Sequence, residues 1–389
     1  MLKKKLISYG SHFIDQNDIN GVSKVLKSKF LTQGPLQKKF EKDLKNYFHV
    51  KNAVTCSSGT SAIHLAMLAM NIKKNDIVLM PVTNFISAYN ISSFLGCKIY
   101  YVDIDEYSGL VNSKTIINCI KENNLKKIDL IFLMHHGGKV CNLEEINSLK
   151  KLYKFKIIED ACHAVGSTYE YDGKVFKSGC SLHSDVSIFS FHAIKTITTG
   201  EGGALLTNKS SIAKKAELLR SHGIKRSDNH WKYDVVTKGL NYRLNEIGCS
   251  LGISQLKKIN KFIKYRRKIA LNYFRLLEKY KNIISLPEKK QLKYSSWHLF
   301  TISINFSKFK KKKYDLFKFM KKKNILLQQH YIPINLFKFS QKNKNLKGSK
   351  FFFNNSFTLP IHLKIEKIDQ NRIVKELIHY IKLNKKKKI

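Results

Sequence analysis

The sequence predicts an α/β protein in which helices cover both faces of a mostly parallel sheet, followed by a smaller α+β domain. Two observations lead to this fold class. Short apolar runs alternate with helix-like segments between residues 53 and 207, and such alternation is typical of parallel sheets. At 389 residues and 43% hydrophobic content, the chain can also bury the cores of a large domain, residues 1–250, and a small domain, residues 251–389.

Two helices are expected ahead of the sheet. Residues 15–27 begin with an acidic cap and residues 36–48 follow the turn L-T-Q-G-P, so both carry helix start signals. The expected strands are 53–56, 77–80, 98–102, 129–135, 156–159, 186–191 and 203–207, and the expected helices between them are 60–70, 85–94, 114–122 and 143–152.

The chain beyond residue 208 is expected to be more helical. One helix reaches about residue 221, and a long helical stretch at about 245–280 connects the two domains. This mixture of elements suits a small α+β domain packed beside the first. Its expected elements are strand 298–304, basic helix 311–322, strand 325–329 and closing helix 366–383.

The chain is strongly basic, with 71 Lys and Arg residues and a formal net charge of +43. Basic surfaces attract nucleic-acid phosphates, so a non-catalytic nucleic-acid-binding protein is one alternative. The lysines are spread through the whole chain, and their densest clusters, 308–313, 321–323 and 385–388, fall in expected helices or in the tail. No helix-turn-helix, zinc-finger or aromatic RNA-binding pattern accompanies them. We therefore expect no nucleic-acid partner.

Seven cysteines are scattered along the chain without a C-x-x-C pair, which is typical of a protein in a reducing cytoplasm. No apolar run approaches the roughly 18 residues of a transmembrane helix. The opening segment M-L-K-K-K-L-I-S-Y-G is basic but lacks the apolar core of a signal peptide. We expect a cytoplasmic protein that does not associate with a membrane.

An aspartate and a lysine stand out as candidate catalytic residues. Asp160 follows the apolar run 156–159, which places it at the carboxyl end of a strand, where α/β proteins bind ligands. Lys195 lies in the turn between the strands 186–191 and 203–207. A lysine amine condenses with an aldehyde, and a carboxylate facing a pyridine nitrogen keeps that nitrogen protonated. The pair therefore indicates a site for pyridoxal 5'-phosphate (PLP).

The neighbours of Lys195 favour this interpretation. The alternative is that Asp160 is a turn or helix-cap residue and that Lys195 is one of many lysines. A serine and a histidine precede Lys195, and three glycines follow it within residues 200–203. Such a cluster of glycines implies that the backbone turns tightly or approaches a ligand.

The turn S-S-G-T-S-A, residues 57–62, lies between the first strand and its helix. Free backbone N–H groups at a helix N-terminus form an anion site, and Thr60 and Ser61 add hydroxyl donors. We assign this turn to the phosphate of the cofactor. An ordinary helix cap is the alternative.

The segments E-D-A-C-H-A-V-G and F-S-F-H-A-I-K-T-I-T-T-G-E-G-G-A-L-L-T-N contain Asp160 and Lys195. They resemble the cofactor motifs of the PLP-dependent nucleotide-sugar aminotransferases of the DegT type, and the resemblance extends from about Ile14 to beyond Tyr331. It implies the fold of aspartate aminotransferase, fold type I, with PLP as cofactor. It also implies that Lys195 binds PLP and moves protons during amino transfer, while Asp160 stabilises the protonated ring.

The same resemblance assigns further residues to the cofactor. Phe85 would stack on the pyridine ring, although a core phenylalanine is the alternative at this position. His163 would lie near the 3-oxygen of the ring, and Ser190 would add a phosphate contact. In the segment G-L-N-Y-R, Asn241 would reach the phosphate of the neighbouring subunit, which implies a homodimer with shared active sites.

Four residues are candidates for contacting the substrate on the same grounds. Gly34 lies in L-T-Q-G-P, Arg243 in G-L-N-Y-R, and His330 and Tyr331 in Q-Q-H-Y-I-P-I. A Gly-Pro turn and an ion pair are the alternatives for Gly34 and Arg243. The adjacent histidines of H-H-G-G should point in opposite directions, so we expect no metal site.

The resemblance implies amino transfer from L-glutamate to a keto group of a UDP-sugar. The residues around Lys195 and the segment H-Y-I-P-I are most similar to a subgroup that aminates C4 of a UDP-linked 4-keto-6-deoxy-N-acetylhexosamine in pseudaminic acid biosynthesis. Thr196 departs from the proline of that subgroup. Another nucleotide-linked keto sugar, aminated at C3 or C4, is an alternative. A PLP-dependent sugar dehydratase is a further alternative. Those enzymes resemble this family but carry histidine in place of the lysine, so Lys195 argues against a dehydratase.

Overall fold

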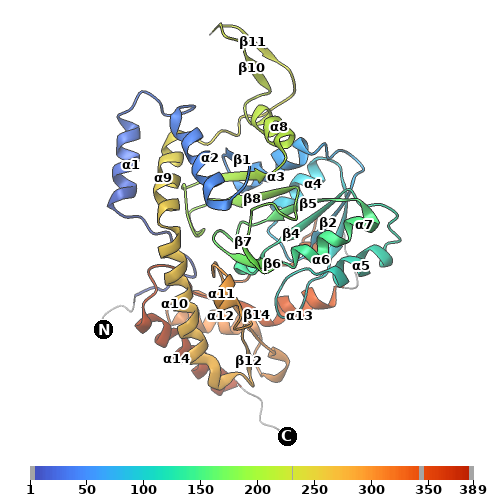
Figure 1. The fold of residues 1–389 in the computed structure, drawn as a ribbon. Helices are drawn as coiled ribbons and strands as arrows, with labels where there is room; N and C mark the ends of the chain where they lie inside the picture. The colour runs from blue at the N-terminus through green and yellow to red at the C-terminus, as the bar shows by residue number, and fades with distance from the viewer. Residues whose placement is uncertain (1–4, 230, 341–345, 385–389) are drawn as a thin grey trace.

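A seven-stranded sheet organises the first part of the chain (Figure 1). The structure, a computed structural model, describes residues 5–229, 231–340 and 346–384. The sheet has the strand order β1-β9-β8-β5-β4-β2-β3. Its strands are β1 (Asn52–Cys56), β2 (Ile77–Pro81), β3 (Lys98–Val102), β4 (Leu130–Met134), β5 (Lys156–Asp160), β8 (Val186–Ser190) and β9 (Gly203–Thr207).

The sheet is mostly parallel, which confirms the prediction. β8, β5, β4, β2 and β3 pair in parallel, whereas β9 pairs antiparallel with both β1 and β8. The carboxyl ends of parallel strands meet at one edge of a sheet. Asp160 at the end of β5 and Ser190 at the end of β8 therefore lie at the same edge.

Helices cover both faces of the sheet, as the sequence predicts. On one face, Ile188 of β8 packs with α3 (Gly59–Ala69) and α8 (Ser210–Arg220). Phe189, the next residue, packs on the other face with α2 (Pro35–Phe48) and α9 (Glu246–Lys257), because successive side chains of a strand point to opposite faces. Further helices beside the sheet are α4 (Ser87–Phe94), α5 (Ser113–Glu122), α6 (Leu143–Ser148) and α7 (Lys150–Tyr153).

A second hydrophobic core lies below the sheet in Figure 1. Three helices, α10 (Ile259–Leu277), α12 (Lys313–Lys322) and α14 (Lys367–Asn384), contribute to it, together with an antiparallel sheet of order β12-β13-β14. Ile7, from near the chain start, also belongs to this core. The other elements here are β12 (Ile284–Ser285), α11 (Gln291–Tyr294), β13 (Phe300–Ile304), α13 (Lys347–Asn355) and β14 (Ser356–Leu359).

The expected strand at 325–329 is absent from the described structure. Ile325 bridges to Ile7, and Gln328 bridges to Thr358. The two ends of the segment thus pair with different partners, and no continuous ladder forms. The bridge to Ile7 nevertheless anchors the start of the chain beside the second core.

The helical stretch expected at 245–280 consists of α9 and α10, which are separated at Lys258. The Lys258 ammonium lies 2.8 Å from the Asp15 carboxylate and 2.7 Å from the Asp18 carboxylate. Asp15 also caps α1 (Gln16–Leu26). The junction between the two helices therefore holds α1 against α9.

Two hairpins add to the elements expected from the sequence. β6 (Thr168–Tyr171) and β7 (Lys174–Lys177) are joined by Asp172 and Gly173, whose φ angles are +48° and +68°. Positive φ at both positions is the geometry of a type I′ turn. The second hairpin, β10 (Ile224–Arg226) and β11 (Tyr233–Val235), projects from the body of the molecule (Figure 1).

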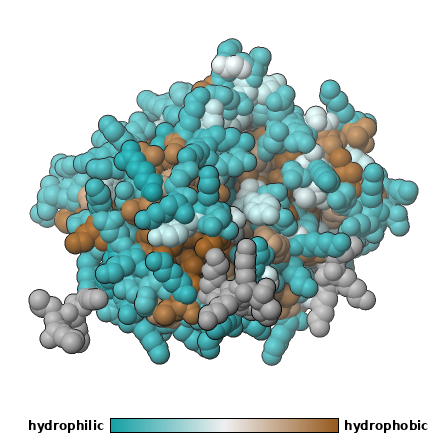
Figure 2. Space-filling view, turned by 90° about the horizontal axis from the view of Figure 1, so that it is seen from below, coloured by the Kyte–Doolittle hydropathy of each residue, from teal (hydrophilic) through white to brown (hydrophobic). Residues whose placement is uncertain are grey.

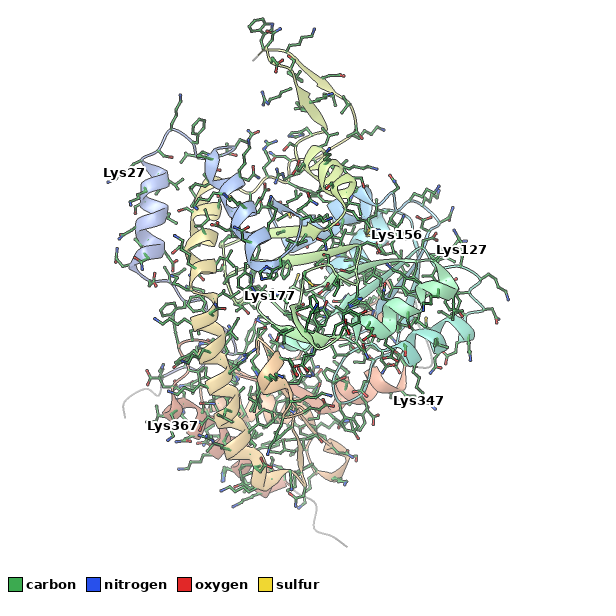
Figure 3. All side chains as sticks on the ribbon, in the orientation of Figure 1. Lys27, Lys127, Lys156, Lys177, Lys347 and Lys367 are labelled. Atoms are coloured by element: carbon green, nitrogen blue, oxygen red, sulfur yellow. The ribbon has the colours of Figure 1, made fainter. Side chains whose placement is uncertain are left out.

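Basic side chains are distributed over the whole molecule. The six lysines labelled in Figure 3 are spread across the view, from α1 to the lower core. The face seen in Figure 2 is largely hydrophilic, with hydrophobic patches between the polar side chains. The basic tail expected at 385–388 lies outside the described residues. Within those residues, no helix combines the length and the apolar content needed to cross a membrane.

A buried carboxylate connects β5 to β8 and to the segments around them. Glu159 is 1% exposed and accepts hydrogen bonds from the Gly179 N–H at 2.7 Å and the Ser187 hydroxyl at 2.8 Å. His135 Nε2 lies 2.9 Å from the same carboxylate. The Cys141 N–H donates to Nδ1 of His135 at 3.2 Å, so Nε2 carries the proton. Burial opposes ionisation of Glu159, but these hydrogen bonds outweigh it and hold its pKa below the usual value.

We predict that Glu159→Ala lowers the free energy of unfolding by about 3–5 kcal/mol, because it leaves several buried donors without an acceptor. Glu122→Ala, at an exposed position of α5, is the matched control and should change stability by less than about 0.5 kcal/mol. Chemical denaturation of both variants measures the difference. An unchanged unfolding midpoint for Glu159→Ala would contradict the role of this carboxylate.

Candidate active site

The carboxyl edge of the sheet carries a cavity of about 510 Å³, a size that suits a cofactor or small substrate. Its walls come from the N-terminus of α3, the ends of β5 and β8, the turn before β9 and the segment 328–331. The sequence-predicted residues that line it are Thr60, Phe85, Asp160, His163, Ser190, Lys195, His330 and Tyr331.

Asp160 and Lys195 face this cavity from neighbouring parts of the sheet. The Asp160 side chain is buried, and its Oδ1 accepts the Cys162 N–H at 3.1 Å. Lys195 lies in a tight turn, in which its N–H donates to the carbonyl oxygen of His192 at 2.9 Å. Burial lowers the pKa of the Lys195 amine, although Cys162 and Asp160 oppose this shift. A lower pKa increases the fraction of neutral amine, which is the nucleophilic form.

The turn at the N-terminus of α3 provides an anion site in the cavity wall. Ser58 caps the helix by accepting the Ser61 N–H at 3.1 Å, while Gly59 and Thr60 line the cavity. The Ser61 hydroxyl is directed inward and lies 3.0 Å from the Ser57 hydroxyl and 2.8 Å from the Ser58 hydroxyl. In this chain Ser61 therefore stabilises the turn, and Thr60 lies on the cavity side.

The glycines after Lys195 allow close backbone packing. A Cβ atom at Gly203 would lie 2.3 Å from the carbonyl oxygen of Ser58 and 2.8 Å from the nitrogen of Gly59. Gly200 has open space around it and a φ of +80°, a conformation that favours glycine. The glycine cluster thus brings β9 against the anion-binding turn.

Phe85 is 53% exposed and lines the cavity, so the alternative of a core phenylalanine is wrong. Its ring centroid lies 5.8 Å from that of Tyr331. An exposed aromatic ring in a cavity wall offers a face on which a flat ligand can stack.

Gly34 lies away from this cavity, at the start of α2. The Glu246 carboxylate accepts the N–H groups of Leu36 at 2.8 Å and Gln37 at 3.1 Å, and it caps the helix in this way. A Cβ atom at Gly34 would lie 2.7 Å from the same carboxylate. The absence of a side chain at Gly34 therefore makes room for this cap.

Asn241 and Arg243 also lie outside the cavity of their own chain. Asn241 is exposed and bridges to Ser221. Arg243 lines a separate hollow of about 480 Å³ together with Arg226 and His222. One copy of the chain does not bring these residues to Lys195.

Other residues in the cavity wall carried no assigned role from the sequence. Tyr9 is one of them, and its ring centroid lies 5.7 Å from that of His330. The bridge between Ile7 and Ile325 brings Tyr9 to the site, so no local sequence signal marks it. The others include Met134, Cys162, His192, Glu201, Gln328 and Gln329.

The two histidines after β4 point apart, as the sequence predicts. His135 contacts Glu159, whereas Nε2 of His136 lies 3.0 Å from the carbonyl oxygen of His330. Across the described ranges, no group of three or more His, Cys, Asp or Glu side chains is arranged to hold a metal ion.

The chain has relatives among known aminotransferases. A sequence profile of the DegT/DnrJ/EryC1/StrS aminotransferase family matches residues 12–378. The UDP-4-amino-4,6-dideoxy-N-acetyl-beta-L-altrosamine transaminase of Campylobacter jejuni subsp. jejuni serotype O:23/36 (strain 81-176) is 36% identical over 386 residues, which cover 98% of this chain and 99% of the relative.

Solved structures share the fold along nearly the whole chain. Helicobacter pylori PseC, described as an aminotransferase involved in the biosynthesis of pseudoaminic acid, has a TM-score of 0.88 at 30% identity, covering 97% of this chain and 100% of that chain. The PLP-form of Spr1654 from Streptococcus pneumoniae has a TM-score of 0.86 at 24% identity, covering 95% and 97%. The fold type I architecture expected from the sequence is thereby confirmed.

We predict that Gly203→Ala weakens PLP binding by about tenfold, because the new Cβ atom would displace the Ser58–Gly59 turn and such overpacking costs about 1–3 kcal/mol. Gly21→Ala, on α1 and away from the site, is the matched control, since its Cβ atom would lie 3.1 Å from the Ser250 hydroxyl of α9. Equilibrium dialysis with PLP measures both affinities. Equal affinities for Gly203→Ala and wild type would show that the turn tolerates the added atom.

Proposed function

The chain belongs to the DegT/DnrJ/EryC1/StrS aminotransferase family, and on this premise we propose that it transfers the amino group of L-glutamate to C4 of a UDP-linked 4-keto-6-deoxy-N-acetylhexosamine. The products are UDP-4-amino-4,6-dideoxy-N-acetyl-β-L-altrosamine and 2-oxoglutarate. The observation that carries the proposal is that Lys195 and Asp160 line one cavity. The names of the Campylobacter jejuni and Helicobacter pylori relatives support the choice of sugar and a role in pseudaminic acid biosynthesis.

The residues of the cavity fit PLP as the cofactor. Lys195 suits the aldehyde, Asp160 the ring nitrogen and Phe85 the ring face, while the turn 58–60 and Ser190 suit the phosphate. Bound PLP supplies an electron sink that stabilises negative charge on the carbon next to the transferred nitrogen. The PLP-form of the Streptococcus pneumoniae neighbour supports this assignment.

The protein residues hold the ring and move the proton. Burial favours the neutral amine of Lys195, which with PLP bound would take a proton from the donor carbon and return it to the carbon of the cofactor. With the keto sugar, Lys195 would move the proton in the opposite direction. Asp160 would keep the proton on the ring nitrogen, and Phe85 would shield the ring face from water. A dehydratase with histidine in place of Lys195 lacks this amine, so amino transfer is favoured.

A shortage of positive charge in the cavity supports shared active sites. Lys195 is the one lysine or arginine among the described residues that line it, and Asp160 and Glu201 add negative charge. The PLP phosphate, the glutamate carboxylates and the UDP diphosphate are all anions, which proteins bind with basic side chains. A single copy of the chain does not provide those side chains at this cavity.

We infer that a second copy of the chain supplies them. The hollow beside Arg243 is lined by Arg226, Lys214 and His222, and Asn241 is exposed nearby. In the proposed homodimer, Asn241 of one subunit reaches the phosphate and Arg243 reaches anionic groups in the other subunit's cavity. Gln33 also lines this hollow, so its neighbour Gly34, at the start of α2, lies close to the hollow.

The unpaired cysteines fit a cytoplasmic enzyme.

Incubation with glutamate and a panel of UDP-keto sugars tests the reaction. We expect the protein to convert the 4-keto-6-deoxy-N-acetylhexosamine into its 4-amino product, identified by mass spectrometry and NMR. Lys195→Ala should lose both the product and the visible absorption band of bound PLP, whereas Lys27→Ala on the exposed end of α1 should keep both. Amination at C3, or of another sugar only, would correct the substrate. A visible band that persists in Lys195→Ala would refute the role of the lysine.

Complementation tests the shared site. Lys195→Ala and Asn241→Ala should each be inactive alone, because each lacks one part of every site. A heterodimer of the two variants contains one site with both residues intact, so it should recover about half of the wild-type activity per dimer. Differently tagged chains, co-expressed and purified through both tags, provide the heterodimer. Absence of recovery would mean that both residues serve the same subunit.

A further inference from the structure

A buried lysine of α12 reaches from the second core toward the wall of the cavity. Lys313 is the first residue of α12 and is only 3% exposed. The two lysines before it, Lys311 and Lys312, are exposed. An ammonium group is costly to bury unless it is hydrogen-bonded. The position of Lys313 therefore depends on the acceptors around it.

Three oxygen atoms accept hydrogen bonds from the ammonium group of Lys313. They are the side-chain amide oxygen of Gln329, the carbonyl oxygen of Phe353 and, at 3.4 Å, the carbonyl oxygen of Ser356. An ammonium group has three N–H donors and no acceptor, so these partners use all of its donors. Burial lowers the pKa of Lys313 to about 7, whereas the three acceptors favour its charged form.

The three acceptors belong to different segments of the chain. Phe353 lies in the last turn of α13, Ser356 is the first residue of β14, and Gln329 lies in the segment 328–331 of the cavity wall. The carbonyl oxygens of a last helical turn lack partners within the helix, and a cation there is favourable. The ammonium group of Lys313 thus joins the junction of α13 and β14, in the lower part of Figure 1, to the cavity wall.

The wall segment 328–331 is not held by a strand ladder. Gln328 and Thr358 of β14 exchange backbone hydrogen bonds of 3.3 and 2.8 Å in an isolated bridge. Nδ1 of His330 lies 3.0 Å from the Thr358 hydroxyl. Gln329 lies between these two contacts, and Lys313 ties its side chain to the start of the same strand, β14. The ammonium group therefore supplies a restraint that a regular ladder would otherwise provide.

This wall borders the part of the cavity that the cofactor does not need. The residues that suit PLP come from the seven-stranded sheet and from the helices and turns beside it. The wall segment instead follows residues 325 and 327, which belong to the second core. A displaced wall would therefore change the space for the substrate more than the binding of the cofactor.

We propose that Lys313 is a positioning residue for the UDP-sugar substrate, because its ammonium group holds Gln329 and thereby fixes the wall segment 328–331 beside the sugar. This inference rests on the proposed function, since it requires amino transfer in this cavity. Lys313 is not among the residues that line the cavity. It acts on the substrate only through the residues of the wall.

Steady-state kinetics of Lys313→Met tests the proposal. Methionine keeps much of the buried stem but removes the ammonium group. With glutamate and the UDP-linked 4-keto sugar at about pH 6, where the ammonium form prevails, KM for the sugar should rise about tenfold, as for one lost hydrogen bond to a charged group. The turnover number kcat and KM for glutamate should change by less than about twofold. Lys312→Met makes the same substitution at the exposed neighbour and should leave all three constants unchanged.

Gln329→Met tests whether Lys313 acts through the wall. This variant leaves Lys313 its two carbonyl acceptors, so it disturbs the fold less than Lys313→Met. It should raise KM for the sugar by a similar factor, and the double variant Lys313→Met/Gln329→Met should match the single variants. Hydrogen exchange of residues 325–334 should become faster in each of these variants, whereas exchange in α14 should not change. Additive effects on KM would overturn the proposal, since the two residues would then act independently.

The remaining outcomes separate this inference from the proposed function. An active wild type with an unchanged KM for the sugar in Lys313→Met would overturn the inference and leave the amino transfer intact. If Lys313→Met does not fold, an unchanged KM in Gln329→Met overturns the inference in the same way. Equal increases in KM for the sugar and for glutamate would also overturn it, because they indicate a general disturbance of the cavity. A wild type that aminates none of the UDP-keto sugars would overturn the proposed function and this inference with it.

Discussion

The parallel pairing of β5 with β8 is the constraint on which the site depends. It places Asp160 at the carboxyl end of β5 and the turn that carries Lys195 just after the carboxyl end of β8. The buried Glu159 carboxylate, directly before Asp160, fixes this arrangement because it accepts hydrogen bonds from Gly179, which lies between the two strands, and from Ser187 of β8. Asp160 is thus held by a structural carboxylate whose side chain points to the opposite face of the same strand. Of these two adjacent residues, Glu159 stabilises the fold and Asp160 belongs to the site.

Much of the fold could be predicted because its elements are specified locally. Apolar runs of the sheet and the capped helices before it are visible in the sequence, and Asp172-Gly173 would also have indicated the β6–β7 hairpin. The segment 325–329 looks like a strand, but its pairing depends on Ile7 and on Thr358, which are distant in the sequence. Tyr9 reaches the cavity through the same distant pairing. Local patterns contain no information about such partners.

The residues of the candidate site differ in the same way: some could be placed from local elements, and others depend on distant contacts. Thr60, Asp160 and Lys195 lie at strand ends or helix starts of one sheet, so the topology itself brings them together. Asn241 and Arg243 do not reach this cavity within one chain, and no pattern within a single chain predicts contacts between two. The pairing of His163 with Tyr331 joins residues 168 positions apart. A motif identifies such residues, but only the folded geometry shows that they are in contact.

The charge of the protein acquires a simple physical explanation from the same geometry. A lysine or arginine is costly to bury without a partner, so most of the 71 basic residues lie where water reaches them. Lys195 is kept in the cavity wall, and burial favours its neutral form. The surrounding imidazoles of His163, His298 and His330 are also neutral, because burial lowers their pKa values. They therefore provide hydrogen bonds without adding positive charge beside the amine, which preserves its nucleophilic form.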